Sequence, residues 1–190
     1  MSRWCNTCHL ENVTGRYEPC DENCPVFGKD FNDLAKRIIA AHVSDEDMLP
    51  DDCLYLSGFL TTDYDGIFCV ADSKEYWCSK NSIISSIESY ARENGFIREK
   101  HTGLGGTQSF IKDCNMRAFF TEDETSLSEA MLLFDANMYG GDLVTDTSLC
   151  GYSEWTITGM DLDEFTIGGH DLKRELNSHM GEYIHLIIEC

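Results

Sequence analysis

The stretch that says most about the fold is residues 171–189, DLKRELNSHMGEYIHLIIE. Asp171 is a residue type that caps the start of a helix, and Gly181 is typical of the position just after a helix ends. The run YIHLIIE that follows, residues 183–189, is rich in apolar and β-branched residues and predicts a strand. The stretch therefore predicts a short helix over residues 171–180 that leads directly into a closing strand.

Working outward, the apolar spacing predicts a mixture of further helices and strands. Helices are expected over residues 30–43, 82–94 and 126–138, the last opened by a capping box at Ser126 and Glu129 and closed by Gly140 and Gly141. Strands are expected over residues 54–60, 67–71, 96–100, 109–114, 116–120, 155–158 and 164–167. Because these elements show no regular strand–helix–strand spacing, the sequence predicts an α+β fold with small mixed sheets and three to four helices.

The length of 190 residues is typical of one domain with at most a small appendage. A composition of 42% hydrophobic and 11% aromatic residues is enough to bury a sizeable core. The predicted organisation is a Cys-rich segment over residues 1–27, similar to a zinc knuckle, followed by an acidic α+β domain over residues 28–190. Residues 28–120 and 121–190 are candidate subdomains of the second part.

Four of the ten cysteines form a C-x2-C-x11-C-x3-C pattern of Cys5, Cys8, Cys20 and Cys24. Two close pairs separated by a short loop are typical of a tetrahedral structural zinc site, which leaves no coordination position open for chemistry. Unpaired thiols and disulfides are the alternatives, and His9 is an alternative ligand. The other six cysteines, mostly in apolar strand-like contexts, are interpreted as core residues of a protein in a reducing compartment. They are Cys53, Cys69, Cys78, Cys114, Cys150 and Cys190.

The charge of the chain is strongly one-sided, with 34 Asp and Glu against 14 Lys and Arg and a formal net charge of −20. No Lys or Arg occurs between residues 118 and 172. Ordinary solvated surfaces mix both signs, so two hypotheses stay open: a soluble acidic surface without a charged function, or a folded anionic surface that copies the charge spacing of nucleic acid. The acidic residues expected to contact a partner are Asp45, Glu46, Asp47, Asp51, Asp52, Glu122, Asp123, Glu124, Asp161, Asp163 and Glu164.

Several function classes are disfavoured. No apolar run reaches the roughly 18–20 residues that a membrane span needs, and the N-terminal residues lack the apolar segment of a secretory signal. Direct binding of nucleic acid is disfavoured because the acidic surface would repel phosphates. Gly103, Gly105 and Gly106 precede strand-like sequence, which favours a hairpin loop over a phosphate-binding loop. No catalytic motif is found.

The span 118–172 and the acidic cluster 45–52 resemble the charge layout of acidic anti-defence proteins of phages and mobile elements, the anti-CRISPR and anti-restriction DNA mimics. This resemblance implies an inhibitor, not an enzyme, that acts in the host bacterial cytoplasm and blocks the basic nucleic-acid-binding surface of a CRISPR effector or restriction nuclease. The alternative hypothesis is a zinc-binding adaptor that regulates another protein by direct contact. A third is a hydrolase that uses His170, His179 or His185.

Overall fold

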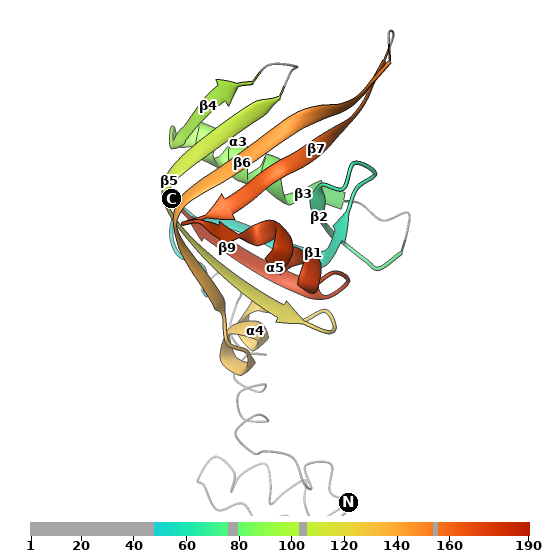
Figure 1. The fold of residues 1–190 in the computed structure, drawn as a ribbon. Helices are drawn as coiled ribbons and strands as arrows, with labels where there is room; N and C mark the ends of the chain where they lie inside the picture. Colours follow the sequence, from blue (N-terminus) through green and yellow to red (C-terminus); the bar gives the residue numbers. More distant parts are fainter. Residues whose placement is uncertain (1–47, 76–79, 103–105, 154–155) are drawn as a thin grey trace, which may run out of the picture.

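The computed structural model describes residues 48–75, 80–102, 106–153 and 156–190. Within these ranges the chain forms one nine-stranded sheet and three helices. The sheet curls strongly, and β6 and β7 extend together as a long ribbon (Figure 1). The elements in chain order are β1 (Leu54–Thr62), β2 (Phe68–Ala71), β3 (Lys80–Ser82), α3 (Ile83–Glu93), β4 (Ile97–His101), β5 (Thr107–Thr121), α4 (Leu127–Leu133), β6 (Asn137–Ser153), β7 (Thr156–Ile167), β8 (His170–Asp171), α5 (Leu172–Ser178) and β9 (Tyr183–Glu189).

The predicted α+β class with small mixed sheets is wrong. The described residues are mostly β, and their strands form a single sheet in the order β3-β2-β1-β9-β5-β6-β7-β8, with β4 paired to β5. All of the described pairings are antiparallel. The sequence near residue 140 misled the prediction, because the two glycines that were expected to end a helix lie inside β6.

The last strand in the sequence, β9, lies in the middle of the sheet between β1 and β5. Successive side chains of a strand point to opposite faces. Ile184, Leu186 and Ile188 therefore join the main core, together with Leu172 and Leu176 of α5. Helix α3 contributes a further four buried side chains to that core: Ile83, Ile84, Ile87 and Ala91.

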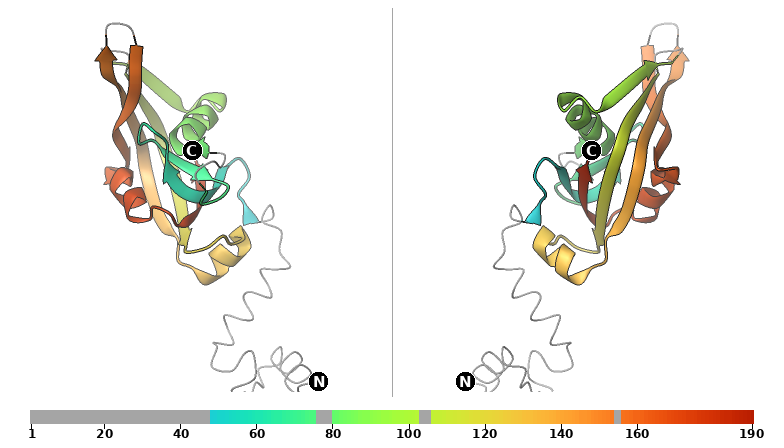
Figure 2. Two further views of the ribbon diagram at one scale, coloured as in Figure 1. Left: turned by 90° about the vertical axis from the view of Figure 1, so that its right-hand side faces the viewer. Right: turned by 90° about the vertical axis from the view of Figure 1, so that its left-hand side faces the viewer.

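A second, smaller core lies on the other face of β9 and β5. It is formed by Phe119 and Ile187 from the strands and by Leu127 and Ala130 from α4. In both views of Figure 2, α4 lies beside the start of β1 and away from α3. Because α4 covers only one end of this face, the neighbouring positions of β1 and β9 are left to form a pocket.

The sequence located several elements correctly. The strand at residues 183–189 is confirmed, and so is the helix at residues 82–94, where Ser82 is the N-cap of α3 and its hydroxyl accepts from the backbone N–H of Ser85. The predicted helix over residues 126–138 is confirmed at its start, where Ser126 caps α4, but α4 ends at Leu133.

The segments predicted for residues 1–27 and 30–43 lie outside the described residues, as do Asp45, Glu46 and Asp47. The four cysteines of the predicted zinc site lie there too. Among the helices of the described residues, none is both long enough and apolar enough to span a membrane.

Candidate functional site

An open pocket of about 550 Å³, which we call the β1–β9 pocket, lies between β1, β9 and the segment that leads from β5 into α4. It is lined by Tyr55, Ser57, Glu124, Thr125, Ser126, Glu129, Tyr183 and His185. Two tyrosines, an imidazole, three Ser or Thr hydroxyls and two carboxylates thus line one space.

The strand register explains why these side chains meet. Ser57 of β1 lies opposite His185 of β9, and Phe59 lies opposite Tyr183. Residues two apart on a strand share a face, so Tyr55 and Ser57 point to the same side as Tyr183 and His185. The Phe59 and Tyr183 rings pack edge to face, with centroids 5.1 Å apart.

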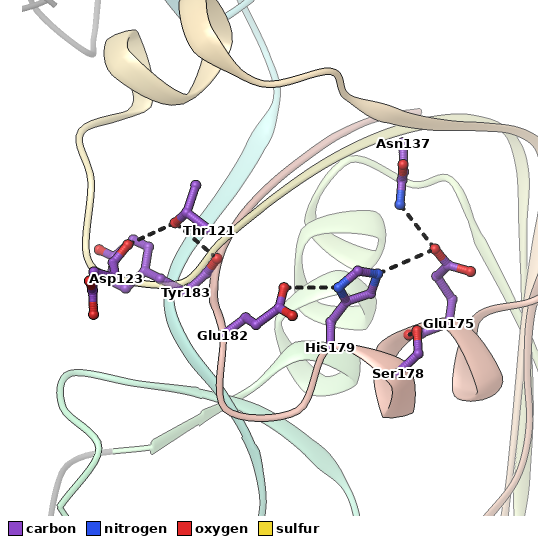
Figure 3. Close-up of polar contacts among 8 residues, drawn as sticks. All are labelled: Thr121, Asp123, Asn137, Glu175, Ser178, His179, Glu182 and Tyr183. Carbon is purple, nitrogen blue, oxygen red and sulfur yellow. Dashed lines mark hydrogen bonds and ion pairs between the residues drawn. The ribbon is translucent and has the colours of Figure 1, made fainter. Parts of the chain in front are cut away.

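The loop from β5 to α4 is held against β9 by Thr121, which is only 4% exposed. Its hydroxyl lies 2.8 Å from the main-chain oxygen of Asp123 and 3.4 Å from that of Tyr183, as Figure 3 shows. Helix α4 then begins with Ser126, whose side-chain oxygen accepts from the backbone N–H of Glu129. These bonds fix the loop that carries Glu122, Asp123 and Glu124 and hold Glu124 at the rim of the pocket.

His185 forms the floor of the pocket and is 1% exposed. Its Nδ1 lies 2.7 Å from the Tyr55 hydroxyl, and its Nε2 lies 3.2 Å from Oγ1 of Thr125. The imidazole and the Tyr55 ring are nearly parallel, with 9° between their planes. Because both ring nitrogens have hydroxyl partners, His185 serves to fix the positions of Tyr55 and Thr125 rather than to offer a vacant base.

A second polar cluster surrounds Glu175 of α5 (Figure 3). Its carboxylate accepts from the Asn137 side chain at 3.0 Å and lies 3.7 Å from Nε2 of His170 and 3.8 Å from Nε2 of His179. The other ring nitrogen of His179 lies 2.9 Å from the Glu182 carboxylate. His179 also stacks on Phe120, with ring centroids 3.7 Å apart.

Sequence reasoning missed this second cluster. His170 and His179 do not share a helical face, which argued against a joint role, but Glu175 lies between them and contacts both. The same carboxylate affects Tyr139, where burial first, and then a hydrogen bond to Glu175, raise the pKa to about 12. Glu175 in α5 and His179 at its C-cap are four residues apart, and this spacing is the sequence signal that would have indicated the contact.

The predicted partner-contacting acids lie in separate places. Glu122, Asp123 and Glu124 are exposed in the β5–α4 loop, and Asp51 and Asp52 are exposed just before β1. These two groups lie at opposite ends of β9, roughly 17 Å apart by the rise of a strand, because Leu54 pairs with Ile188 and Thr121 pairs with Tyr183.

The remaining predicted acids, Asp161, Asp163 and Glu164, lie on β7. Asp161 and Asp163 line a second open pocket with Asp65 from the turn between β1 and β2. Lys173, which also lines it, donates to the main-chain oxygen of Leu162. Glu164 lies directly across from Asp146 of β6.

In the part of the chain that the structure describes, no three His, Cys, Asp or Glu side chains are grouped so that they could hold a metal ion. The four cysteines proposed as zinc ligands lie outside that part, so the zinc site stays a prediction. Cys53, Cys69, Cys114 and Cys190 are free thiols, and burial raises the pKa of Cys53 and Cys69.

No family model, curated protein or solved structure matches this chain.

Proposed function

We propose that the protein is an acidic inhibitor that occupies the basic nucleic-acid-binding surface of a bacterial defence nuclease, such as a CRISPR effector or a restriction enzyme. The observation that carries the proposal is how little of the acidic charge is neutralised within the fold. Residues 48–190 contain 25 Asp and Glu against nine Lys and Arg.

The few cations are largely engaged elsewhere. Lys74, Lys80 and Lys173 donate to main-chain oxygens, those of Glu122, Thr62 and Leu162. Between Lys or Arg and a carboxylate, the described residues form two ion pairs, Arg92–Glu99 and Arg117–Glu189. Lys and Arg of the described residues therefore leave most of the acidic charge un-neutralised, which supports a surface that attracts a basic partner.

The position of Glu164 supports the same proposal. It faces Asp146 across β6 and β7, and like charges directly opposite each other in a sheet destabilise it. A cation from a partner, placed between the two carboxylates, would remove this repulsion and pair with both of them. Arg and Lys side chains that normally hold phosphates are suited to this, because both ligands are anionic oxygens.

The proposal is tested by cleavage assays on a panel of CRISPR and restriction nucleases, with the protein added before or after target DNA. We expect inhibition of one enzyme when the protein is added first, and a steep loss of inhibition between about 50 and 200 mM salt. Inhibition that is independent of salt and of the order of addition would contradict the proposal, as would no effect on any nuclease.

Charge-neutralising variants locate the contact. The triple variant E122Q/D123N/E124Q changes the loop, and D161N/D163N/E164Q changes β7. The triple variant whose residues lie in the interface is expected to inhibit about tenfold more weakly. This corresponds to a loss of about 1.4 kcal/mol of binding free energy over three exposed charge pairs. E99Q is the control, because the carboxylate of Glu99 is already paired with Arg92. Equal inhibition by both triple variants and the unmodified protein would exclude these acids from the interface.

The zinc-binding adaptor is the alternative proposal, and the cysteines separate the two. A C5S/C8S variant is expected to keep its inhibition if the acidic domain makes the contact. Loss of partner binding in that variant, with the circular dichroism of the β domain unchanged, would favour the adaptor.

A further inference from the structure

We infer that the β1–β9 pocket binds an arginine side chain of the basic partner, an assignment that rests on the proposed function and gives it a specific anchor. The chemistry of the lining points to this ligand. Of the described residues that line the pocket, none is Lys or Arg, whereas Glu124 and Glu129 supply carboxylates. A guanidinium pairs with a carboxylate through two parallel hydrogen bonds, which makes arginine the matching cation.

The aromatic walls favour the same ligand. Tyr55 and Tyr183 line the pocket, and Tyr183 is only partly buried. A planar guanidinium stacks on an aromatic ring, and it is less strongly hydrated than an ammonium group. Hydroxyl oxygens of Ser57, Thr125 and Ser126 add acceptors for the five N–H groups that a guanidinium carries.

An independent observation beside the pocket is that a lysine of the chain itself is held at this surface. Nζ of Lys74 lies 4.9 Å from the centroid of the Phe59 ring and donates to the main-chain oxygen of Glu122 at 3.1 Å. Phe59 is paired with Tyr183 across β1 and β9, and Glu122 belongs to the same loop as Glu124. The chain thus already holds a cation between an aromatic ring and this loop, next to the pocket.

The pocket is also held in shape before a ligand arrives. Thr121 fixes the loop to Asp123 and Tyr183, and His185 fixes Tyr55 and Thr125. Binding therefore does not have to order the walls, and less of the interaction free energy is lost on binding.

The test is a titration of the ¹⁵N-labelled full chain with N-acetyl-arginine methylamide, followed by NMR. We expect saturable shifts of the amide signals of Glu124, Thr125 and Tyr183. The citrulline counterpart has nearly the same shape without the charge, and the lysine counterpart has the charge without the planar group. We expect no saturable binding of the citrulline compound and weaker binding of the lysine compound.

Two variants provide the matched comparison. E124Q removes an exposed carboxylate at the pocket and is expected to weaken arginine binding about threefold, in line with an exposed charge pair. E122Q removes the neighbouring exposed carboxylate and should change the affinity little. Glu122 contacts Lys74 through its main-chain oxygen and not through its side chain, so this contact is kept in the variant. Retained amide spectra show that both variants are folded.

Equal weakening by E122Q and E124Q would mean general attraction to an acidic surface and would overturn the assignment. Equal binding of the arginine, lysine and citrulline compounds would overturn it as well. The outcome is separable from that of the proposed function. If E124Q inhibits the nuclease as well as the unmodified protein does, the assignment of the pocket to arginine is wrong and the proposed function stands. If the pocket binds arginine but the protein inhibits no nuclease, the proposed function is wrong and the assignment of the pocket stands.

Discussion

At the scale of single residues, Glu175 is the side chain that organises most of its surroundings. It contacts Asn137, His170 and His179, and it accepts a hydrogen bond that helps to raise the pKa of Tyr139. The contacts with Asn137, Tyr139 and His170 follow from no motif, because they join α5 to β6 and β8. The i, i+4 pair of Glu175 and His179 could be predicted from sequence, but Asn137 and Tyr139 required the fold.

Tyr139 offers a residue-scale prediction on pH. Burial and the hydrogen bond to Glu175 raise its pKa from 10.0 to about 12, so the fold favours the neutral phenol. The resulting stabilisation is fully present below pH 10 and is lost as the pH rises through about 12. A difference titration of tyrosinate absorbance between the unmodified protein and Y139F should give a pKa of about 12 for this tyrosine.

The variant E175Q keeps an acceptor but removes the charge, and it should lower the pKa of Tyr139 toward the ordinary value. The comparison isolates the charge of Glu175 from the effect of burial, which is the larger cause. A Y139F difference curve centred near the ordinary pKa of 10.0 would contradict the prediction.

At the scale of elements, local patterns located the helices and strands better than they determined their lengths. Ser82 and Ser126 cap α3 and α4 as the sequence indicated, because capping depends on neighbouring residues alone. The 17-residue strand β6 was missed because Gly140 and Gly141 normally weaken a strand. Here a close approach to Gly168 explains Gly141, because a Cβ on Gly141 would lie 2.7 Å from the Gly168 Cα atom.

At the scale of elements, we predict that Gly168 is required for β6 to pack closely against the turn after β7. Its φ is +56°, and a Cβ there would overlap the carbonyl oxygen of Gly140 in β6. We expect G168A to lower the free energy of unfolding by roughly 1–3 kcal/mol through overlap, in addition to the cost of a left-handed backbone. G169A is the control, because Gly169 also has a positive φ, +82°, but a Cβ there would meet no atom within 4 Å.

Chemical denaturation of the two variants therefore separates the two costs. The difference between G168A and G169A measures how closely β6 approaches the turn after β7. Equal unfolding free energies for the two variants would show that this close approach does not contribute to stability.

At the scale of the whole molecule, the sheet topology was beyond the reach of the sequence. The strand at residues 183–189 was recognised, but its central place between β1 and β5 depends on pairings between residues far apart in the chain, such as Ala118 with Leu186. Periodicity reports which face of a strand is apolar and says nothing about which strand lies beside it. The β1–β9 pocket depends on those pairings, so its residues were individually visible in the sequence but their grouping was not.

The charge of the whole molecule leads to the last prediction. With 25 acidic and nine basic side chains in residues 48–190, repulsion among carboxylates opposes the folded state. Raising the ionic strength from about 0.01 to 0.15 M shortens the screening length from about 30 Å to about 8 Å, which weakens this repulsion. We expect salt to stabilise the protein by about 1 kcal/mol, which corresponds to a rise of about 2–4 °C in the thermal midpoint.

A single pair tests the cause of that stabilisation. Glu164 and Asp146 lie directly opposite each other in the sheet, and E164Q removes one of their two charges. The variant should stabilise the protein by about 0.2–1 kcal/mol at low salt. The gain should disappear at high salt, where the repulsion is already screened. D161N removes the same charge from a position opposite Ser148, so it should give a smaller gain. A thermal midpoint that falls with salt would show that repulsion among carboxylates does not destabilise the fold. Equal gains for E164Q and D161N would show that Glu164 and Asp146 do not repel each other measurably. A cationic partner would then relieve no repulsion by binding between them.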